Sequence, residues 1–93
     1  MEGLDKKKIG VEIKIRRMRN NMMQTELAAF LGISQTHLSN VESGRVMLGI
    51  KLLLKLKDRF GCTLDEMVDP EGYKKMLEQK RQIRKYKMVR YDE

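Results

Sequence analysis

The sequence predicts an all-α protein, with five short helices in one small domain and a basic amphipathic helix at the C-terminus. Its 93 residues allow only one small hydrophobic core, and a core of that size is normally helical. Apolar residues recur at helical spacing in the candidate segments. Capping residues, asparagines, glycines and the single proline fall between these segments, where helices begin or end.

The first expected helix runs from about residue 6 to residue 20. Residues 1–8 are expected to form a basic N-terminal tail, in which Asp5 is a candidate cap for the helix. Asparagine is second only to glycine in the left-handed conformation that ends many helices. The helix should therefore end at the pair Asn20 and Asn21.

The buried face of this first helix includes a charged residue. Ile9, Ile13 and Arg17 lie at i, i+4 and i+8, so Arg17 shares the core-facing stripe. A buried arginine needs a carboxylate partner. Glu42, near the end of the third helix, is the natural candidate.

Residues 24–45 read as two short helices joined by a tight turn. Gly32 stands where the chain must reverse, because glycine enters a left-handed conformation without steric cost. Ser34 follows as a plausible N-cap of the second helix of the pair. The expected buried residues are Leu27, Ala28 and Leu31 in the first helix and Leu38 and Val41 in the second.

The outward face of the helix that follows Ser34 is uncharged but polar. It carries side chains at i, i+1, i+4, i+5 and i+8, namely Gln35, Thr36, Ser39, Asn40 and Ser43. A solvated face in a chain with 35% charged residues would instead carry lysine and glutamate. Amides and hydroxyls hydrogen-bond base edges, so the pattern favours a DNA-binding helix-turn-helix over a helical hairpin with a polar outer face.

At these residues the chain resembles the lambda-repressor-like helix-turn-helix family of Cro/C1, or XRE-type, repressors. The resemblance extends from Ile9 to Pro70, about two thirds of the chain. Its marks are Gln24, the pair Leu27-Ala28, the turn Leu31-Gly32-Ile33-Ser34, Gln35, and the closing Glu42-Ser43-Gly44-Arg45. The set is specific, although each mark alone would be weak.

The resemblance implies roles for individual residues. Base reading would fall to Gln35, Thr36, Ser39 and Asn40, and phosphate contacts to Gln24, His37, Ser43 and Arg45. The family also has an internal salt bridge at the positions of Arg17 and Glu42, so this pair is expected to be structural. His37 has no companion residues for a role as general base or metal ligand.

Three positions depart from the family pattern. Asn21 replaces the usual glycine, and Met23 replaces a serine or threonine N-cap, at a cost of about 1 kcal/mol. We expect Met22 and Met23 to pack into the core. Leu48-Gly49 replaces Pro-Ser, which leaves the apolar run 46–48 free to touch thymine methyl groups, to pack on a partner subunit or to tuck under the fourth helix.

Two further helices should complete a domain of residues 9–70. The fourth, about residues 50–60, would bury Leu53, Leu56 and Phe60, and expose Lys51, Lys55 and Arg59. Thr63 and Glu66 form a capping box for a short fifth helix. Asp65, Glu66 and Asp69 are better explained as acids in a first helical turn than as a metal cluster.

Residues 71–93 lie outside the resemblance and form a basic C-terminal extension. An imperfect helical stripe of apolar residues runs through Tyr73, Met76, Leu77, Ile83 and Tyr86. Three uses compete: a dimerisation helix, a basic arm on the DNA backbone, or a helix folded back on the domain. The apolar stripe favours dimerisation or self-docking, because an arm needs none.

The formal net charge of +7 is concentrated at the two ends of the chain. Residues 1–23 carry seven lysine or arginine residues against three acidic ones, residues 24–69 carry five against six, and residues 70–93 carry eight against four. A polyanion contacted by the flanks and read by the centre fits this arrangement. A basic surface that serves only solubility is the alternative.

The sequence argues against several other classes of protein. It has no nucleophile–base pair, phosphate-binding loop or metal set, so we expect no enzyme, no cofactor and no metal. Cys62 is the single cysteine, which excludes an internal disulfide and suggests a packing thiol rather than a redox sensor. No apolar run is long enough for a signal peptide or membrane span, so we expect a cytoplasmic protein without a small-molecule ligand.

The function expected from the sequence is sequence-specific binding of double-stranded DNA as a transcriptional regulator. The expected protein is a repressor that binds a pseudo-palindromic operator as a homodimer. The alternative is an antitoxin or adaptor module that binds a partner protein through residues 71–93.

Overall fold

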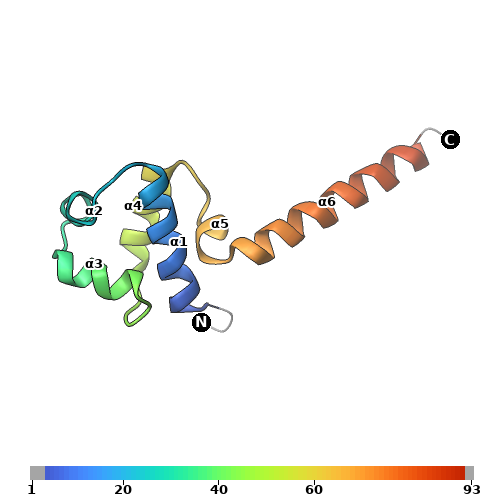
Figure 1. The fold of residues 1–93 in the computed structure, drawn as a ribbon. Coiled ribbons are helices and arrows are strands. Elements are labelled where there is room, and N and C mark those ends of the chain that lie inside the picture. Colours follow the sequence, from blue (N-terminus) through green and yellow to red (C-terminus); the bar gives the residue numbers. More distant parts are fainter. Residues whose placement is uncertain (1–3, 92–93) are drawn as a thin grey trace.

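The computed structural model describes residues 4–91, except for the side chains of Tyr73 and of residues 82–91. Every secondary-structure element in this part of the chain is a helix, as expected (Figure 1). The helices are α1 (Lys6–Arg19), α2 (Gln24–Leu31), α3 (Gln35–Glu42), α4 (Ile50–Phe60), α5 (Leu64–Val68) and α6 (Pro70–Tyr91). The first five pack around one core, and α6 projects from it.

The first helix begins and ends at the expected residues. The Asp5 carboxylate accepts hydrogen bonds from the backbone N–H groups of Lys7 and Lys8, at 2.9 and 3.3 Å. Residues 6–8, placed in the basic tail by the sequence, are thus the first turn of α1. Asn20 caps the other end, and Asn21 follows with a left-handed φ of 55°, so the predicted asparagine termination is confirmed.

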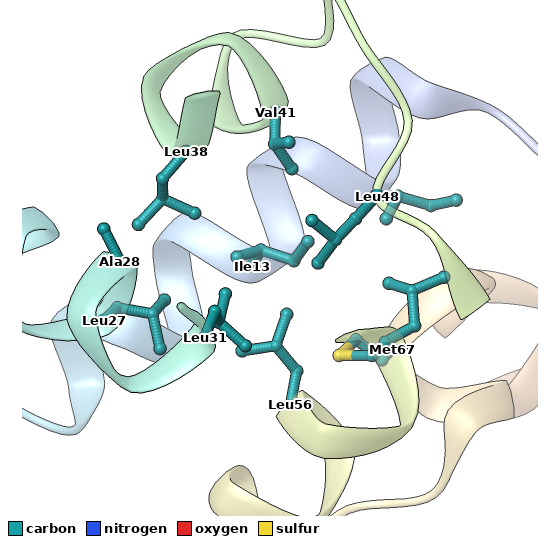
Figure 2. Close-up of a cluster of buried hydrophobic side chains, with 11 residues drawn as sticks. Ile13, Leu27, Ala28, Leu31, Leu38, Val41, Leu48, Leu56 and Met67 are labelled. Carbon is teal, nitrogen blue, oxygen red and sulfur yellow. The ribbon is translucent and has the colours of Figure 1, made fainter. Parts of the chain in front are cut away.

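Eleven buried side chains from α1 to α5 and the α3–α4 loop form the core (Figure 2). They are Ile9, Ile13, Leu27, Ala28, Leu31, Leu38, Val41, Leu48, Leu53, Leu56 and Met67. Figure 2 shows that Leu38 and Val41 of α3 and Leu27, Ala28 and Leu31 of α2 converge with Ile13 of α1. This packing holds the short helices α2 and α3, which would be unstable alone at eight residues each.

A glycine brings α1 and α3 into close contact. A side chain at Gly10 would collide with the backbone carbonyl oxygens of Val41 and Glu42. Gly44, just after α3, has a left-handed φ of 80° and lies against the backbone of Lys7. The last turn of α3 and the loop after it therefore rest directly on α1.

The two methionines before α2 differ from the expectation. Met22 packs against the core, but Met23 is 64% exposed, so its predicted burial is wrong. Its backbone N–H donates to the Glu26 carboxylate at 3.0 Å. Because this position holds the extended N-cap conformation, its side chain points out of the helix pair and into solvent.

The apolar loop before α4 is divided between core and surface. Leu48 is buried in the core, which selects the third of the alternatives left open by the sequence. Val46 and Met47 remain more than a third exposed. Of the apolar run 46–48, only Leu48 is therefore part of the core.

The helix α5 connects the core to α6. Thr63 and Glu66 form the predicted capping box, with the Glu66 N–H donating to Thr63 Oγ1 at 3.2 Å. Arg16 of α1 lies 2.8 Å from Glu12 and 3.8 Å from Glu66, which links α1 to α5. The chain then turns at Asp69, whose carboxylate accepts the Gly72 N–H at 3.1 Å.

Figure 1 shows α6 running away from the other helices, and the molecule measures 59 × 27 × 20 Å. Met76 is half-buried and Leu77 is exposed. Tyr73, Ile83 and Tyr86, the other members of the predicted stripe, have side chains outside the described part. No helix in the described residues is long and apolar enough to cross a membrane.

Candidate DNA-binding interface

The turn between α2 and α3 has the geometry that its sequence requires. Gly32 adopts a left-handed φ of 72°, and the next N–H, of Ile33, donates to the Ala28 carbonyl at 3.0 Å. Ser34 Oγ then accepts the His37 N–H at 3.0 Å and caps α3. Backbone groups at the end of α2 and at the start of α3 are thus hydrogen-bonded by residues within or next to the turn. These bonds fix the angle between the two helices.

The outward face of α3 is free of contacts with the core. Gln35, Thr36, His37, Ser39 and Ser43 are exposed, whereas Asn40 is half-buried. The backbone carbonyl of Asn40 accepts hydrogen bonds from the Ser43 hydroxyl at 3.1 Å and the Arg45 N–H at 2.9 Å. These bonds fix the chain as it leaves the helix.

A buried ion pair fastens α3 to α1. Arg17 Nε lies 2.7 Å from Glu42 Oε2, and its Nη2 donates to Oε1 at 3.1 Å. Arg17 Nη1 also donates to the Met22 carbonyl at 2.8 Å. Glu42 is almost completely buried, so this two-pronged pair satisfies a charge that would otherwise destabilise the core.

The ion pair continues outward through two glutamines. Gln24 Nε2 donates to Glu42 Oε1 at 3.1 Å, and Gln35 Nε2 donates to Gln24 Oε1 at 3.4 Å. The structure therefore brings four of the expected residues, Arg17, Glu42, Gln24 and Gln35, into one chain of contacts. Its last member, Gln35, keeps its own carbonyl oxygen and one N–H available at the surface.

Sequence reasoning missed one residue of this surface. Lys14 of α1 lines a depression of about 250 Å³ together with Arg17, Gln24, Ser39, Glu42 and Ser43. An exposed lysine on α1 gave no signal by itself, because its neighbourhood depends on the crossing of α1 and α3 at Gly10. Helical spacing places Lys14 next to the Ile13–Arg17 stripe of α1, but it does not show that Lys14 lies beside α3.

Arg45 and His37 lie apart from this depression. Arg45 follows the buried Gly44 beyond the end of α3 and is exposed, and His37 is in the first turn of α3. Arg45 thus follows the C-terminal end of α3, and Lys14 lies beside Ser39 and Ser43 in the last turns of the same helix. An uncharged reading face bordered by cations is suited to a groove between two phosphate backbones.

The cysteine has no place on this surface. Cys62 is half-buried against the core, next to the start of α5. Burial raises the pKa of the Cys62 thiol, although the positive charge of Arg16 opposes this. A protonated thiol is a poor nucleophile, which fits a packing role.

Known proteins share both the sequence and the fold of this region. The helix-turn-helix family model HTH_3 matches residues 13–67. The ImmF control region 10 kDa protein of Bacillus phage phi105 is 43% identical over 53 residues. This match spans 57% of the chain and 59% of the phage protein.

Two solved structures are similar in fold. The P22 c2 repressor protein, solved in complex with synthetic operator 9T, has a TM-score of 0.61 and 24% identity, and the match covers 66% of this chain and 92% of that one. The clp gene regulator ClgR from Corynebacterium glutamicum has a TM-score of 0.66 and 22% identity, and its match covers 100% of this chain and 98% of that one. At these identities the likeness shows the fold.

The family match includes all of α2 to α4, α5 up to Met67, and the C-terminal half of α1 from Ile13 onward. It therefore covers the helix pair, the turn and the buried ion pair described above. The family consists of DNA-binding regulators and not of enzymes. The chain belongs to the HTH_3 helix-turn-helix family, the Cro/C1-type, or XRE, transcriptional regulators.

Proposed function

We propose that the protein is a repressor that binds a specific pseudo-palindromic operator in double-stranded DNA as a homodimer. The observation that carries this proposal is the outer face of α3, which is exposed, polar and uncharged. Its inner face is held by the core and by the Arg17–Glu42 pair. A rigid helix with free amides and hydroxyls is what direct reading of the major groove requires.

In this proposal Gln35 is the principal base-reading residue. Its contact with Gln24 uses one amide N–H and leaves a second N–H and the carbonyl oxygen. Those two groups match the N7 acceptor and N6 donor of adenine. Thr36, Ser39 and Asn40 would set the remaining sequence preference.

Phosphate contacts would position the helix in the groove. We assign them to Gln24, His37, Ser43 and Arg45, and we add Lys14 because it borders the same depression as Ser39 and Ser43. Such contacts raise affinity for every sequence and make binding salt-dependent.

A second copy would dock on the exposed apolar face of α4. Ile50 and Leu54 are adjacent on this face, and Met47 precedes them in the loop. Lys57 and Asp58, paired at 2.9 Å, bring both charges to the same helix. A two-fold dimer contact places the same surface of each copy against the other. A surface that carries both positive and negative charges can pair with itself, whereas a purely basic surface would repel its copy.

The test of DNA reading is selection of bound sequences from a random double-stranded pool at near-physiological salt. We expect an enriched pseudo-palindrome with half-sites about one helical turn apart. Gln35→Ala should relax the preference at one position of each half-site, whereas Gln79→Ala, an exposed glutamine on α6, should not. An unchanged preference in Gln35→Ala would show that the docking register is wrong.

The test of the dimer compares two leucines of equal exposure. Leu54 on α4 is 42% exposed and Leu77 on α6 is 43% exposed. We expect Leu54→Gln to shift sedimentation equilibrium toward the monomer and Leu77→Gln to leave it unchanged. The reverse result would place the dimer contact on α6.

The projection of α6 favours a second candidate function, an adaptor or antitoxin that binds a partner protein through residues 71–93. Selection that enriches no sequence, with only salt-sensitive DNA binding, would favour this candidate. A partner that is retained by the full chain and lost on Leu77→Gln would support it directly.

A further inference from the structure

The outer face of α1 carries an apolar stripe that the fold does not use. Val11, Ile15 and Met18 lie at i, i+4 and i+7 and are 53, 37 and 58% exposed. At 3.6 residues per turn they lie opposite Ile9 and Ile13, which face the core. The helix α1 is therefore apolar on two opposite sides, and only one of them is covered within the described chain.

Cations border this stripe on both sides. By helical position, Lys7 and Lys14 lie along one edge, and Lys8 and Arg19 along the other, and all four are exposed. Lys8 lies 3.8 Å from Glu71, and among the described residues the other three have no carboxylate within salt-bridge distance. We refer to Val11, Ile15 and Met18 with these four cations as the α1 outer face.

The carboxylates nearest the α1 outer face are already engaged. Glu12 is paired with Arg16 at 2.8 Å. Asp5 caps α1, and Asp69 accepts the Gly72 N–H. These carboxylates and Glu71 keep their charge but all lie at the N-terminal end of the face. The unpaired positive charge that the face presents to a partner is therefore at its C-terminal end, at Lys14 and Arg19.

The stripe continues into a groove at its N-terminal end. Val11 lines this groove with Val68 and Pro70, and its volume is about 360 Å³. Its charged rim consists of Asp5, Lys7, Lys8, Glu12, Asp69 and Glu71. An apolar track thus runs from Met18 along α1 to the junction of α5 and α6. The track exceeds two helical turns in length, which is enough for the apolar stripe of an approaching helix.

We propose that the α1 outer face is the docking site for an acidic amphipathic helix of a partner protein. The apolar stripe would accept the apolar side of that helix, and the flanking cations would pair with its carboxylates. The sign of the charge excludes α6 of a second copy as the occupant. Between residues 74 and 81, α6 carries Lys74, Lys75, Lys80 and Arg81 against Glu78 alone.

This site is linked to the DNA-binding surface through Lys14. Lys14 borders the α1 outer face and also the depression beside Ser39 and Ser43. If Lys14 contacts a phosphate, as in the proposed function, an acidic helix and DNA compete for it. The partner would then weaken DNA binding and act as an antagonist of repression.

The probe is a pair of designed helical peptides of about 18 residues. Both carry the same leucine stripe, flanked by glutamates in one peptide and by lysines in the other. Titration into the full chain, followed by fluorescence anisotropy and amide NMR shifts, should show the glutamate peptide binding at least about tenfold more tightly. The shifts should cluster at residues 8–19.

Matched variants locate the site. Ile15→Gln should weaken binding of the glutamate peptide about tenfold, and Leu77→Gln, at a similarly exposed leucine on α6, should not. Both positions are on the surface, so both variants should fold, as circular dichroism would verify. Equal binding of the two peptides, no binding at about 1 mM, or loss on Leu77→Gln alone would overturn the proposal.

Two further measurements test whether the occupant is a second copy and whether it competes with DNA. If Ile15→Gln lowered the oligomeric state in sedimentation, the occupant would be a second copy, and the proposal would be overturned. The glutamate peptide should also weaken DNA binding in the wild type more than in Lys14→Gln. Peptide binding by a protein that selects no DNA sequence would contradict the proposed function but leave the docking site standing.

Discussion

The domain formed by α1 to α5 and the projecting α6 are both helical, but different interactions stabilise their helices. Each helix of the domain is at most 14 residues long and is fixed by buried side chains such as Leu38 and Met67. In contrast, α6 extends over 22 residues and leaves the domain after its contact with α5 (Figure 1). Tertiary packing holds short helices, whereas a longer helix depends more on its own backbone hydrogen bonds.

This contrast implies that equivalent substitutions should have unequal effects in the two regions. The chain offers pairs of identical residues, one in the domain and one on α6. Four such pairs test the contrast, and each measures a different kind of interaction.

The largest difference in the free energy of unfolding is expected between the two leucine substitutions. Leu38 is fully buried in α3, whereas Leu77 on α6 is 43% exposed. Leu38→Ala should lower the free energy of unfolding by about 4 kcal/mol, because it leaves a cavity, while Leu77→Ala should change it by less than about 0.5 kcal/mol. Urea denaturation measures both, and similar losses would show that α6 is packed on a partner or on the domain.

The next difference is expected for glutamate. Glu42→Gln leaves the Arg17 guanidinium without its buried carboxylate and should cost about 3 kcal/mol. Glu71, 80% exposed at its side chain, lies 3.8 Å from Lys8, and Glu71→Gln should cost less than about 1 kcal/mol. A loss of stability in Glu42→Gln no larger than in Glu71→Gln would mean that the buried pair does not hold α3 to α1.

Glycine should give a smaller contrast in the same direction. Gly10→Ala forces a methyl group against the carbonyls of Val41 and Glu42 and should cost about 2 kcal/mol, despite the better helix propensity of alanine. At Gly72 the added methyl meets only the Asp69 carboxylate, which can rotate away. The loss of that cap and the gain in propensity should offset each other within about 1 kcal/mol, and thermal denaturation compares the two.

Arginine should give the smallest effect, and on DNA binding rather than stability. Arg45→Gln should weaken binding to all sequences several-fold and reduce the slope of log affinity against log salt by about 0.9, the value for one phosphate contact. Arg81→Gln, an exposed position on α6, should leave the slope unchanged. A reduced slope in Arg81→Gln as well would identify α6 as a basic arm on the DNA backbone.

The features of the fold that could be predicted from the sequence are those that depend on residues close together in the chain. Caps such as Asp5, Ser34 and Thr63 bond backbone groups two or three positions away, so their chemistry is visible in a local pattern. The left-handed turn at Gly32 is local in the same sense. The all-helical fold followed from these signals, and the family followed from the motif between Gln24 and Arg45; both are confirmed.

The part that was not predictable depends on where distant helices meet. Gly10 matters only because α3 crosses α1 at that point, and the exposure of Met23 and burial of Leu48 depend on surfaces formed by other elements. For the same reason Lys14 could not be assigned to the α3 surface from its spacing. The base-reading and phosphate roles of the site residues stay predictions.

The division of α3 into two faces has an evolutionary consequence. Thr36 and Ser39 point away from the core and form no side-chain hydrogen bond within the described chain, whereas Gln35 is tied to Gln24. Substitutions at Thr36 and Ser39 should therefore carry little folding penalty, and under the proposed function they would change which DNA sequence is bound. We therefore expect related members of the family to differ first at these two positions, with Gln35 and its buried anchor changing last.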